Sequence, residues 1–219
     1  MRLTWSPERA SKAYIETVTA CKAYKESGVP ELVSAMAAGW NAQIIFETWA
    51  LGRPIATSIG LAVSSRHTGG RHVCVVPDEG SRSDYIKMVG ETMGAATEVL
   101  IAGEASEEAM EGVKGIDFMV VDCRQEDFCK LLSTARLGDR GAVLVCKNAS
   151  SRTLSDFRWA TILEGRRPPQ GQRRLVRSVF LPVGKGLDIA YVGMSGGRKS
   201  SRWIKCLDHV SGEEVIIRK

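Results

Sequence analysis

The residues best placed for chemistry are acidic side chains at the ends of apolar runs. Asp122 closes the apolar run of residues 118–121, and Glu47 follows the apolar residues 44–46. Ligands of open α/β sheets bind just beyond the carboxyl ends of the strands, so both carboxylates are candidates for ligand contact. The alternative for Asp122 is a solvated or helix-capping aspartate. Glu47 needs partners if its strand is buried, because an unpaired buried charge is costly.

The spacing of the other reactive residues argues against several kinds of site. The six cysteines include no C-x-x-C pair, and the three histidines lack the spacing of zinc ligands. No G-x-x-x-x-G-K or G-x-G-x-x-G segment follows an apolar run, which argues against nucleotide hydrolysis and dinucleotide binding. No Ser-His-Asp or Cys-His constellation stands out. Buried free thiols in a reducing compartment are the simplest interpretation of the cysteines.

Charge is unevenly distributed along the chain, whose formal net charge is +5. Residues 147–219 hold fifteen basic and six acidic residues, a balance of +9, which leaves −4 for residues 1–146. A basic segment can attract phosphate or an acidic partner, but aromatic residues are sparse there, so nucleic acid is an unlikely partner. No apolar run is long enough for a membrane span, and no secretory signal begins the chain. We therefore expect the cytoplasm, with the nucleus as an alternative.

Hydrophobic patterning predicts strands that alternate with helices. Ser6 and Pro7 predict the start of a helix that continues to about residue 26, with an apolar face formed by Ala10, Ala13, Tyr14, Val18 and Cys21. A short helix is expected over residues 31–38. The expected strands cover residues 41–49, 72–76, 97–101, 117–121 and 141–146. Helices are expected after the first four, with cores near residues 55–63, 83–89, 105–110 and 128–135. This alternation predicts right-handed crossovers and a parallel sheet.

The pattern changes after residue 147. Residues 175–183 and 187–192 flank Gly184-Lys185-Gly186 and predict a hairpin. Residues 203–207 and 215–217 predict a second, smaller one. We expect three parts: N-terminal helices over residues 1–40 that pack on the core, an α/β domain over residues 41–193, and a short basic extension over residues 194–219. The expected fold class is a three-layer, Rossmann-like α/β sheet, mostly parallel, of about seven strands with an antiparallel C-terminal hairpin.

Three stretches in this order resemble a known group. The hairpin segment reads Leu181-Pro182-Val183-Gly184-Lys185-Gly186-Leu187, the central strand ends at Asp122, and Gly103-Glu104-Ala105 follows the third strand. They are similar to segments of the class I S-adenosylmethionine-dependent methyltransferase superfamily, specifically its small-molecule O-methyltransferase branch. Within that branch the chain resembles a plant family of uncharacterised methyltransferase-like proteins. The resemblance covers about residues 31–193.

The resemblance implies S-adenosylmethionine as cofactor and a set of residues to hold it. Glu47 and Gly52 match the loop after the first strand, and Asp78 lies near the position of the acid that binds the ribose hydroxyls. Gly103, Glu104 and Ala105 match the turn that holds the adenine. Asp122 matches a ligand position at the end of the fourth strand. The resemblance identifies no catalytic residue.

Three departures from the family pattern bear on its chemistry. Trp49 stands where the loop after the first strand should have its first glycine, and an indole there fills cofactor space unless the loop is rerouted. Pro77 occupies the place of the ribose-binding acid. Metal-dependent relatives use two positions that Asp122 and Asn148 match, but Lys147 stands where they have an aspartate. A lysine opposes a site for a hard cation, so no metal is expected, and Lys147 could form an ion pair with Asp122 instead.

These observations predict a methyltransferase-like protein with a degenerate cofactor loop. Methyl transfer depends chiefly on positioning and needs no covalent nucleophile, which fits the missing constellations. We then expect a small-molecule methyl acceptor as the partner. A homodimer is one assembly that the sequence leaves open. The alternative is a catalytically inactive methyltransferase fold that serves as a binding or scaffold protein. Trp49, Pro77 and Lys147 favour that alternative.

Overall fold

A computed structural model gives the fold of the chain. It describes residues 5–24, 28–93, 97–101, 112–125, 128–151, 157, 159–164, 174–194, 203–207 and 214–218. The central feature of these residues is a seven-stranded sheet in the order β3-β2-β1-β5-β7-β9-β8. The strands are β1 (Ile44–Thr48), β2 (Arg71–Val76), β3 (Thr97–Ile101), β5 (Phe118–Asp122), β7 (Ala142–Lys147), β8 (Arg174–Leu181) and β9 (Leu187–Met194).

The sheet confirms the predicted fold class. The five strands from β3 to β7 are mutually parallel, whereas β8 and β9 form an antiparallel hairpin that pairs with β7. The middle strands β1, β5 and β7 are almost wholly apolar and buried. Strands buried on both faces are typical of parallel sheets that helices cover on each side.

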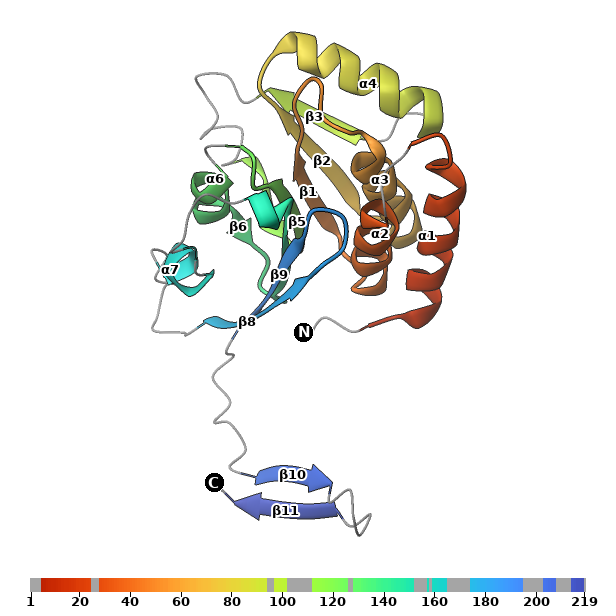
Figure 1. The fold of residues 1–219 in the computed structure, drawn as a ribbon. Coiled ribbons are helices and arrows are strands. Elements are labelled where there is room, and N and C mark those ends of the chain that lie inside the picture. The colour runs from red at the N-terminus through yellow and green to blue at the C-terminus, as the bar shows by residue number, and fades with distance from the viewer. Residues whose placement is uncertain are drawn as a thin grey trace.

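Helices lie on both faces of the sheet (Figure 1). One face is covered by α2 (Val29–Gly39), α3 (Ala56–Thr68) and α4 (Glu79–Met93), and α1 (Pro7–Ala20) packs on α2 and α3. The other face is covered by α6 (Phe128–Thr134) and α7 (Trp159–Glu164). Each face has its own apolar core, so the molecule has three layers.

The first helix starts as predicted, and part of its predicted apolar face is buried. Ser6 Oγ accepts a hydrogen bond from the backbone N–H of Arg9, and Pro7 opens the helix. The helix ends at Ala20 and turns Ala10, Ala13 and Thr17 inward. Of the predicted apolar face, Ala10, Ala13 and Cys21 are buried, whereas Tyr14 and Val18 are 46% and 39% exposed. The small residues face α2 and α3 because these neighbouring helices pack closely.

Several short elements complete the description. The strands β4 (Lys114–Ile116) and β6 (Arg136–Leu137) form a small parallel sheet, and a 3₁₀ turn covers Ala149–Ser151. The strands β10 (Trp203–Leu207) and β11 (Glu214–Arg218) pair with each other. None of the described helices is long and apolar enough to cross a membrane.

The order of the strands places a topological switch between β1 and β5. The chain moves outward from β1 through β2 to β3, and then returns to β5 and moves the other way to β7. Open α/β sheets bind ligands beyond such a switch point, where the loops leave neighbouring strands in opposite directions. Glu47, Asp122 and Lys147 lie at the carboxyl ends of β1, β5 and β7, respectively.

Candidate functional site at the carboxyl edge of the sheet

Glu47 is sealed inside the protein and fully engaged. The side chain is 1% exposed, and Ser58 donates a hydrogen bond of 2.9 Å to its Oε2. Tyr85 donates one of 2.7 Å to Oε1, and His72 Nε2 lies 3.0 Å from the same oxygen. A carboxylate only accepts hydrogen bonds, so Nε2 carries a proton in this arrangement. These partners come from β2, α3 and α4, so Glu47 joins three elements.

The environment of Glu47 favours its ionised form. Burial alone would raise its pKa, but the hydrogen bond and charge of His72, the charge of Lys147 and the Tyr85 hydroxyl together lower it below the usual 4.5. Burial and the nearby Glu47 raise the pKa of Tyr85, so the phenol remains a donor. Glu47 is therefore a buried structural carboxylate, and neither of its oxygens is unpaired.

Trp49 lies in the apolar core between the sheet and the helices. The indole is 2% exposed and meets the ring of Tyr85 edge to face at 5.5 Å. Its N–H donates to the backbone carbonyl of Arg53, 3.2 Å away, and its backbone N–H donates to Val75. The backbone therefore remains paired with β2 one residue beyond β1, and the indole follows Glu47 onto the helix face. Trp49 therefore packs in the core, on the same side of the sheet as Glu47.

Asp122 is held by Arg124 and Asn148. Arg124 Nε and Nη2 donate to the two carboxylate oxygens at 3.0 and 2.6 Å, and the Arg124 backbone N–H adds a bond of 3.0 Å. Asn148 Nδ2 donates to Oδ1 at 3.0 Å. Burial would raise the pKa of Asp122, but these donors and the charge of Lys147 lower it below its usual value. The expected ion pair with Lys147 is therefore wrong, because Arg124 takes that place.

Lys147 is a buried cation at the end of β7. It stands beside Asp122 in the register of the sheet, as predicted, and is 6% exposed. Its side chain lies on the face of Val143 and Val145, which pack against α2. The ammonium forms no hydrogen bond or ion pair with any residue that the structure describes. Its charge still affects the pKa values of Glu47 and Asp122, so it lies near the carboxyl ends of three strands.

The remaining predicted residues are spread along the same edge. Asp78 is exposed after β2, and its Oδ1 accepts the backbone N–H of Ser81 at 2.7 Å, which caps the start of α4. Gly52 is exposed in the loop after β1 with φ of +77°, and a Cβ there would meet no atom within 4 Å. Gly103, Glu104 and Ala105 lie outside the described residues, so their predicted contact with adenine is untested.

A direct hydrogen bond crosses the switch point. Thr48, the last residue of β1, donates through Oγ1 to Gln125 Oε1 at 2.6 Å. Gln125 lies in the turn after β5, where its N–H donates to the carbonyl of Asp122. The two strand ends that would flank a ligand are thus tied together by their own side chains.

Unpaired polar atoms lie at the start of three helices near this edge. Within the described part of the chain, three buried side-chain oxygens have no hydrogen-bond partner: Glu31 Oε2, Thr57 Oγ1 and Ser81 Oγ. They belong to the first turns of α2, α3 and α4. The last two helices follow the carboxyl ends of β1 and β2, and α2 starts beside the turn between β8 and β9, where Gly28 faces Val183. Buried polar atoms normally have a partner, so water or a ligand is expected near them.

The side chains at the edge do not suit a divalent metal ion. Both oxygens of Asp122 accept hydrogen bonds from Arg124, and Asn148 directs its N–H₂ group rather than its carbonyl toward them. The charge of Lys147 adds to that of Arg124. Mg²⁺ and Ca²⁺ require several free oxygen ligands, so this donor set would have to rearrange completely to hold one. Among the described residues, no group of three or more acidic, histidine or cysteine side chains could bind a metal.

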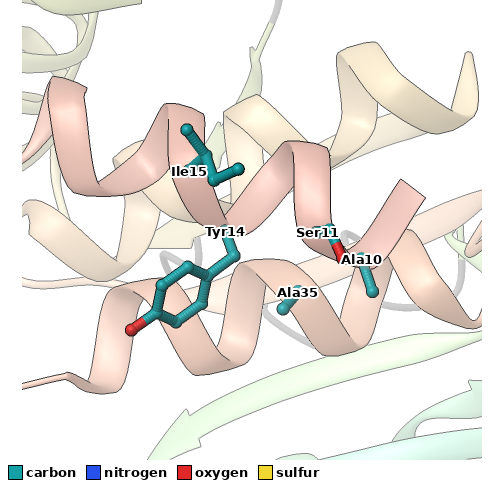
Figure 2. Close-up of a pocket in the computed structure, with 5 residues that line it drawn as sticks. All are labelled: Ala10, Ser11, Tyr14, Ile15 and Ala35. Carbon is teal, nitrogen blue, oxygen red and sulfur yellow. The ribbon is translucent and has the colours of Figure 1, made fainter. Parts of the chain in front are cut away.

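A concave region lies away from this edge, on the outer helices. It has a volume of about 380 Å³ and is lined by five mostly apolar residues of α1 and α2: Ala10, Ser11, Tyr14, Ile15 and Ala35 (Figure 2). None of the predicted ligand residues lines it. It is an open surface groove between two helices, with no charged group to orient a ligand.

Sequence reasoning did not identify most partners of the two carboxylates. Arg124, two residues after Asp122, is the strongest omission, because an arginine so close to a strand-end aspartate can reach back to it in a turn. His72 and Tyr85 also escaped notice. A histidine inside an apolar strand was the available signal for the first, whereas Tyr85 looked like an ordinary core aromatic.

Solved structures with a similar fold are class I S-adenosylmethionine-dependent O-methyltransferases. A methyltransferase from Geobacter sulfurreducens has a TM-score of 0.55 at 18% identity, over 84% of this chain and 89% of that one. The O-methyltransferase TomG from Streptomyces achromogenes, in complex with SAM, has a TM-score of 0.53 at 19% identity, over 83% and 90%. A putative caffeoyl-CoA O-methyltransferase from Staphylococcus aureus has a TM-score of 0.54 at 16% identity, over 82% and 92%.

At these identities the likeness establishes the fold and leaves the activity of this chain to its own residues. A comparison with curated protein sequences found no match. A protein-family model described as "Protein of unknown function (DUF1442)" matches residues 1–219. The chain, with its methyltransferase-like fold, therefore belongs to the DUF1442 family.

Proposed function

We propose that this protein binds S-adenosylmethionine or S-adenosylhomocysteine at the carboxyl edge of its sheet as a non-catalytic, metal-independent binding protein. One observation carries the non-catalytic part. Both carboxylates at the centre of the edge, Glu47 and Asp122, are fully hydrogen-bonded and have lowered pKa values. An efficient general base has a pKa near the working pH and a free lone pair toward the substrate. Neither carboxylate meets these needs.

The binding part rests on what the edge leaves available. The indole of Trp49 is packed into the helix-side core and is 2% exposed, so it is not presented to a ligand at the carboxyl edge. Asp78 is exposed after β2, and only one of its carboxylate oxygens caps α4. The other oxygen can accept hydrogen bonds from ribose hydroxyls. Thr57 Oγ1, in the first turn of α3, is buried and unpaired. These groups suit a polar nucleoside ligand, although the sequence after β1 departs from the loop pattern of the methyltransferase superfamily.

Calorimetry with S-adenosylhomocysteine tests the binding, and Asp78→Asn is the diagnostic variant. Asparagine preserves the helix cap but removes the charge, so affinity should fall about ten-fold, the cost of one hydrogen bond to a charged acceptor. Asp84→Asn, an exposed change in the same helix, is the matched control. Micromolar binding by the wild type with a selective loss in Asp78→Asn supports the proposal. No binding at millimolar ligand refutes it.

Transfer of a labelled methyl group from S-adenosylmethionine to catechol tests the absence of catalysis. We expect no transfer above background, with or without Mg²⁺. Transfer that Mg²⁺ stimulates and EDTA abolishes would contradict both the non-catalytic and the metal-independent parts of the proposal.

The second candidate is an active, metal-independent methyltransferase. The position of Trp49 favours it, because an indole that is buried in the core leaves the carboxyl edge available to align a methyl donor with an acceptor. Alignment alone supplies a large part of the rate enhancement in such displacements. Label transfer that persists in EDTA would support this candidate over the non-catalytic one.

A further inference from the structure

Lys147 is a buried cation whose hydrogen-bonding capacity is unused. The residue is 6% exposed, and its ammonium carries three N–H donors. None of them meets an acceptor among the described residues. The ammonium nitrogen is not among the fully buried unpaired atoms, so it keeps contact with solvent while the rest of the side chain is buried. Among the residues that the structure describes, its three donors are therefore available to water or to the oxygen atoms of a ligand.

The nearby carboxylates do not complete it. Asp122 is occupied by Arg124 and Asn148, and both oxygens of Glu47 are occupied by Ser58, Tyr85 and His72. Their influence on Lys147 acts through space, without direct contact. Arg124 also neutralises Asp122, so the field near the ammonium is less negative than two carboxylates would suggest.

The position of Lys147 points to a ligand rather than a structural role. It ends β7, where the edge of the sheet meets the turn between β8 and β9. It also faces the helix side, where the first turn of α2 has the unpaired Glu31 Oε2. A lysine with only a packing role could be replaced by an apolar residue at lower cost, as its buried neighbours on β7 illustrate.

We propose that Lys147 binds an anionic group, a carboxylate or a phosphate, of a small molecule held at the carboxyl edge of the sheet. The proposal deepens the proposed function, since it assigns one ligand group at the same edge. A compact ammonium accepts either oxyanion as a point charge, without the fixed fork that an arginine would impose. The group comes either from a second molecule or from the methionine tail of an S-adenosyl ligand.

The test uses the full chain, with benzoate and phenyl phosphate as anionic probes and benzamide as the neutral probe. Lys147→Met removes the charge and preserves the length of the side chain, and Lys147→Gln is a second, polar replacement. Lys185→Met changes an exposed lysine in the adjacent turn and is the matched control. Binding is followed by calorimetry, and circular dichroism establishes that each variant is folded.

We expect at least one anion to bind the wild type and Lys185→Met with equal affinity. The affinity of both Lys147 variants for that anion should be lower by at least about ten-fold, as expected for the loss of one charge contact. Benzamide should not discriminate among the proteins. Equal binding of the anions to wild type and to the folded Lys147 variants overturns the proposal. Failure of both anions to bind the wild type at millimolar concentration overturns it too, and leaves water as the partner of the ammonium.

Two further ligands separate this inference from the proposed function and identify the source of the anion. If Lys147→Met weakens S-adenosylhomocysteine but not 5′-methylthioadenosine, which lacks the carboxylate, the methionine tail is the source. If both nucleosides bind the variant as they bind wild type while benzoate or phenyl phosphate is lost, a second molecule is the source. If neither nucleoside binds wild type but an anion does, the proposed function fails and the Lys147 site stands.

Discussion

Trp49 illustrates how a single residue can change the meaning of a familiar loop. In a strand, side chains alternate between faces, so the residue two positions after Glu47 points to the same side. The backbone bond from Trp49 to Val75 maintains this alternation one residue beyond β1. The indole therefore enters the helix-side core beside Tyr85, where a glycine would leave a void.

Replacing Trp49 with glycine should destabilise the protein rather than restore a cofactor loop. Removal of a fully buried aromatic side chain costs about 3–5 kcal/mol, and glycine adds backbone entropy to the unfolded state. Urea unfolding followed by circular dichroism measures the change. Leu51→Ala, at a side chain that is 59% exposed, should stay within about 0.5 kcal/mol of wild type. A Trp49→Gly protein as stable as Leu51→Ala would show that the indole contributes little to the core.

The sequence predicted correctly where residues lie along the sheet edge. It did not predict which side chains form hydrogen bonds and ion pairs with one another. Asp122 and Lys147 were placed side by side because consecutive parallel strands end at the same edge. Their ion pair was not formed, because Arg124 reaches Asp122 from two residues away, and a local partner needs less chain ordering than one from another strand. Glu47 was flagged as needing partners, but their identities depend on how α3 and α4 cross the sheet.

At the scale of elements, the contact between α2 and α3 is set by a glycine. A Cβ on Gly60 would lie 2.7 Å from the backbone carbonyl oxygen of Pro30 in α2. Backbone atoms cannot move aside as a flexible side chain can, so this glycine determines how closely the two helices approach. The small side chains Ala10 and Ala13 have a similar role in the packing of α1.

Two glycine-to-alanine changes in helices should have opposite effects. Gly60→Ala forces α2 and α3 apart, and overpacking of this kind costs about 1–3 kcal/mol. Gly90→Ala, in α4, meets nothing within 4 Å and should stabilise the protein by about 0.5–1 kcal/mol, because alanine restricts the unfolded chain. Thermal unfolding of the two variants side by side measures both. Equal effects of the two changes would mean that Gly60 is not confined by α2.

The large elements were predictable because each has a local signal. All seven strands of the main sheet were expected, since each is an apolar or alternating run of five or more residues between turn formers. The strands β4 and β6 were not predicted, because strands of only three and two residues show no detectable alternation of polar and apolar side chains. The predicted apolar face of α1 is confirmed in part: Ala10, Ala13 and Cys21 are buried, whereas the larger Tyr14 and Val18 are exposed.

At the scale of the whole molecule, the switch point couples stability to the state of the two buried carboxylates. Glu47 links β1, β2, α3 and α4, and Asp122 links the ends of β5 and β7. Each carboxylate accepts several hydrogen bonds that its neutral form would partly lose. The architecture around the switch point thus depends on charges that are held inside the fold.

Acid should therefore destabilise the protein through these groups, and Glu47→Gln should isolate one of them. The folded-state pKa of Glu47 lies below its usual 4.5, and that of Asp122 below its usual 3.8, so the unfolded chain binds more protons in this range. Their contribution is fully present above these usual values and is lost as the pH falls through the lowered folded-state values. Urea unfolding from about pH 7 to about pH 3 should show a falling free energy of unfolding.

Glu47→Gln should cost about 1–3 kcal/mol at neutral pH, because one amide donor replaces an acceptor. It should also flatten the acid limb, whereas Glu91→Gln, at an exposed position, should preserve the wild-type slope. An unchanged acid limb in Glu47→Gln would place the acid sensitivity at other carboxylates.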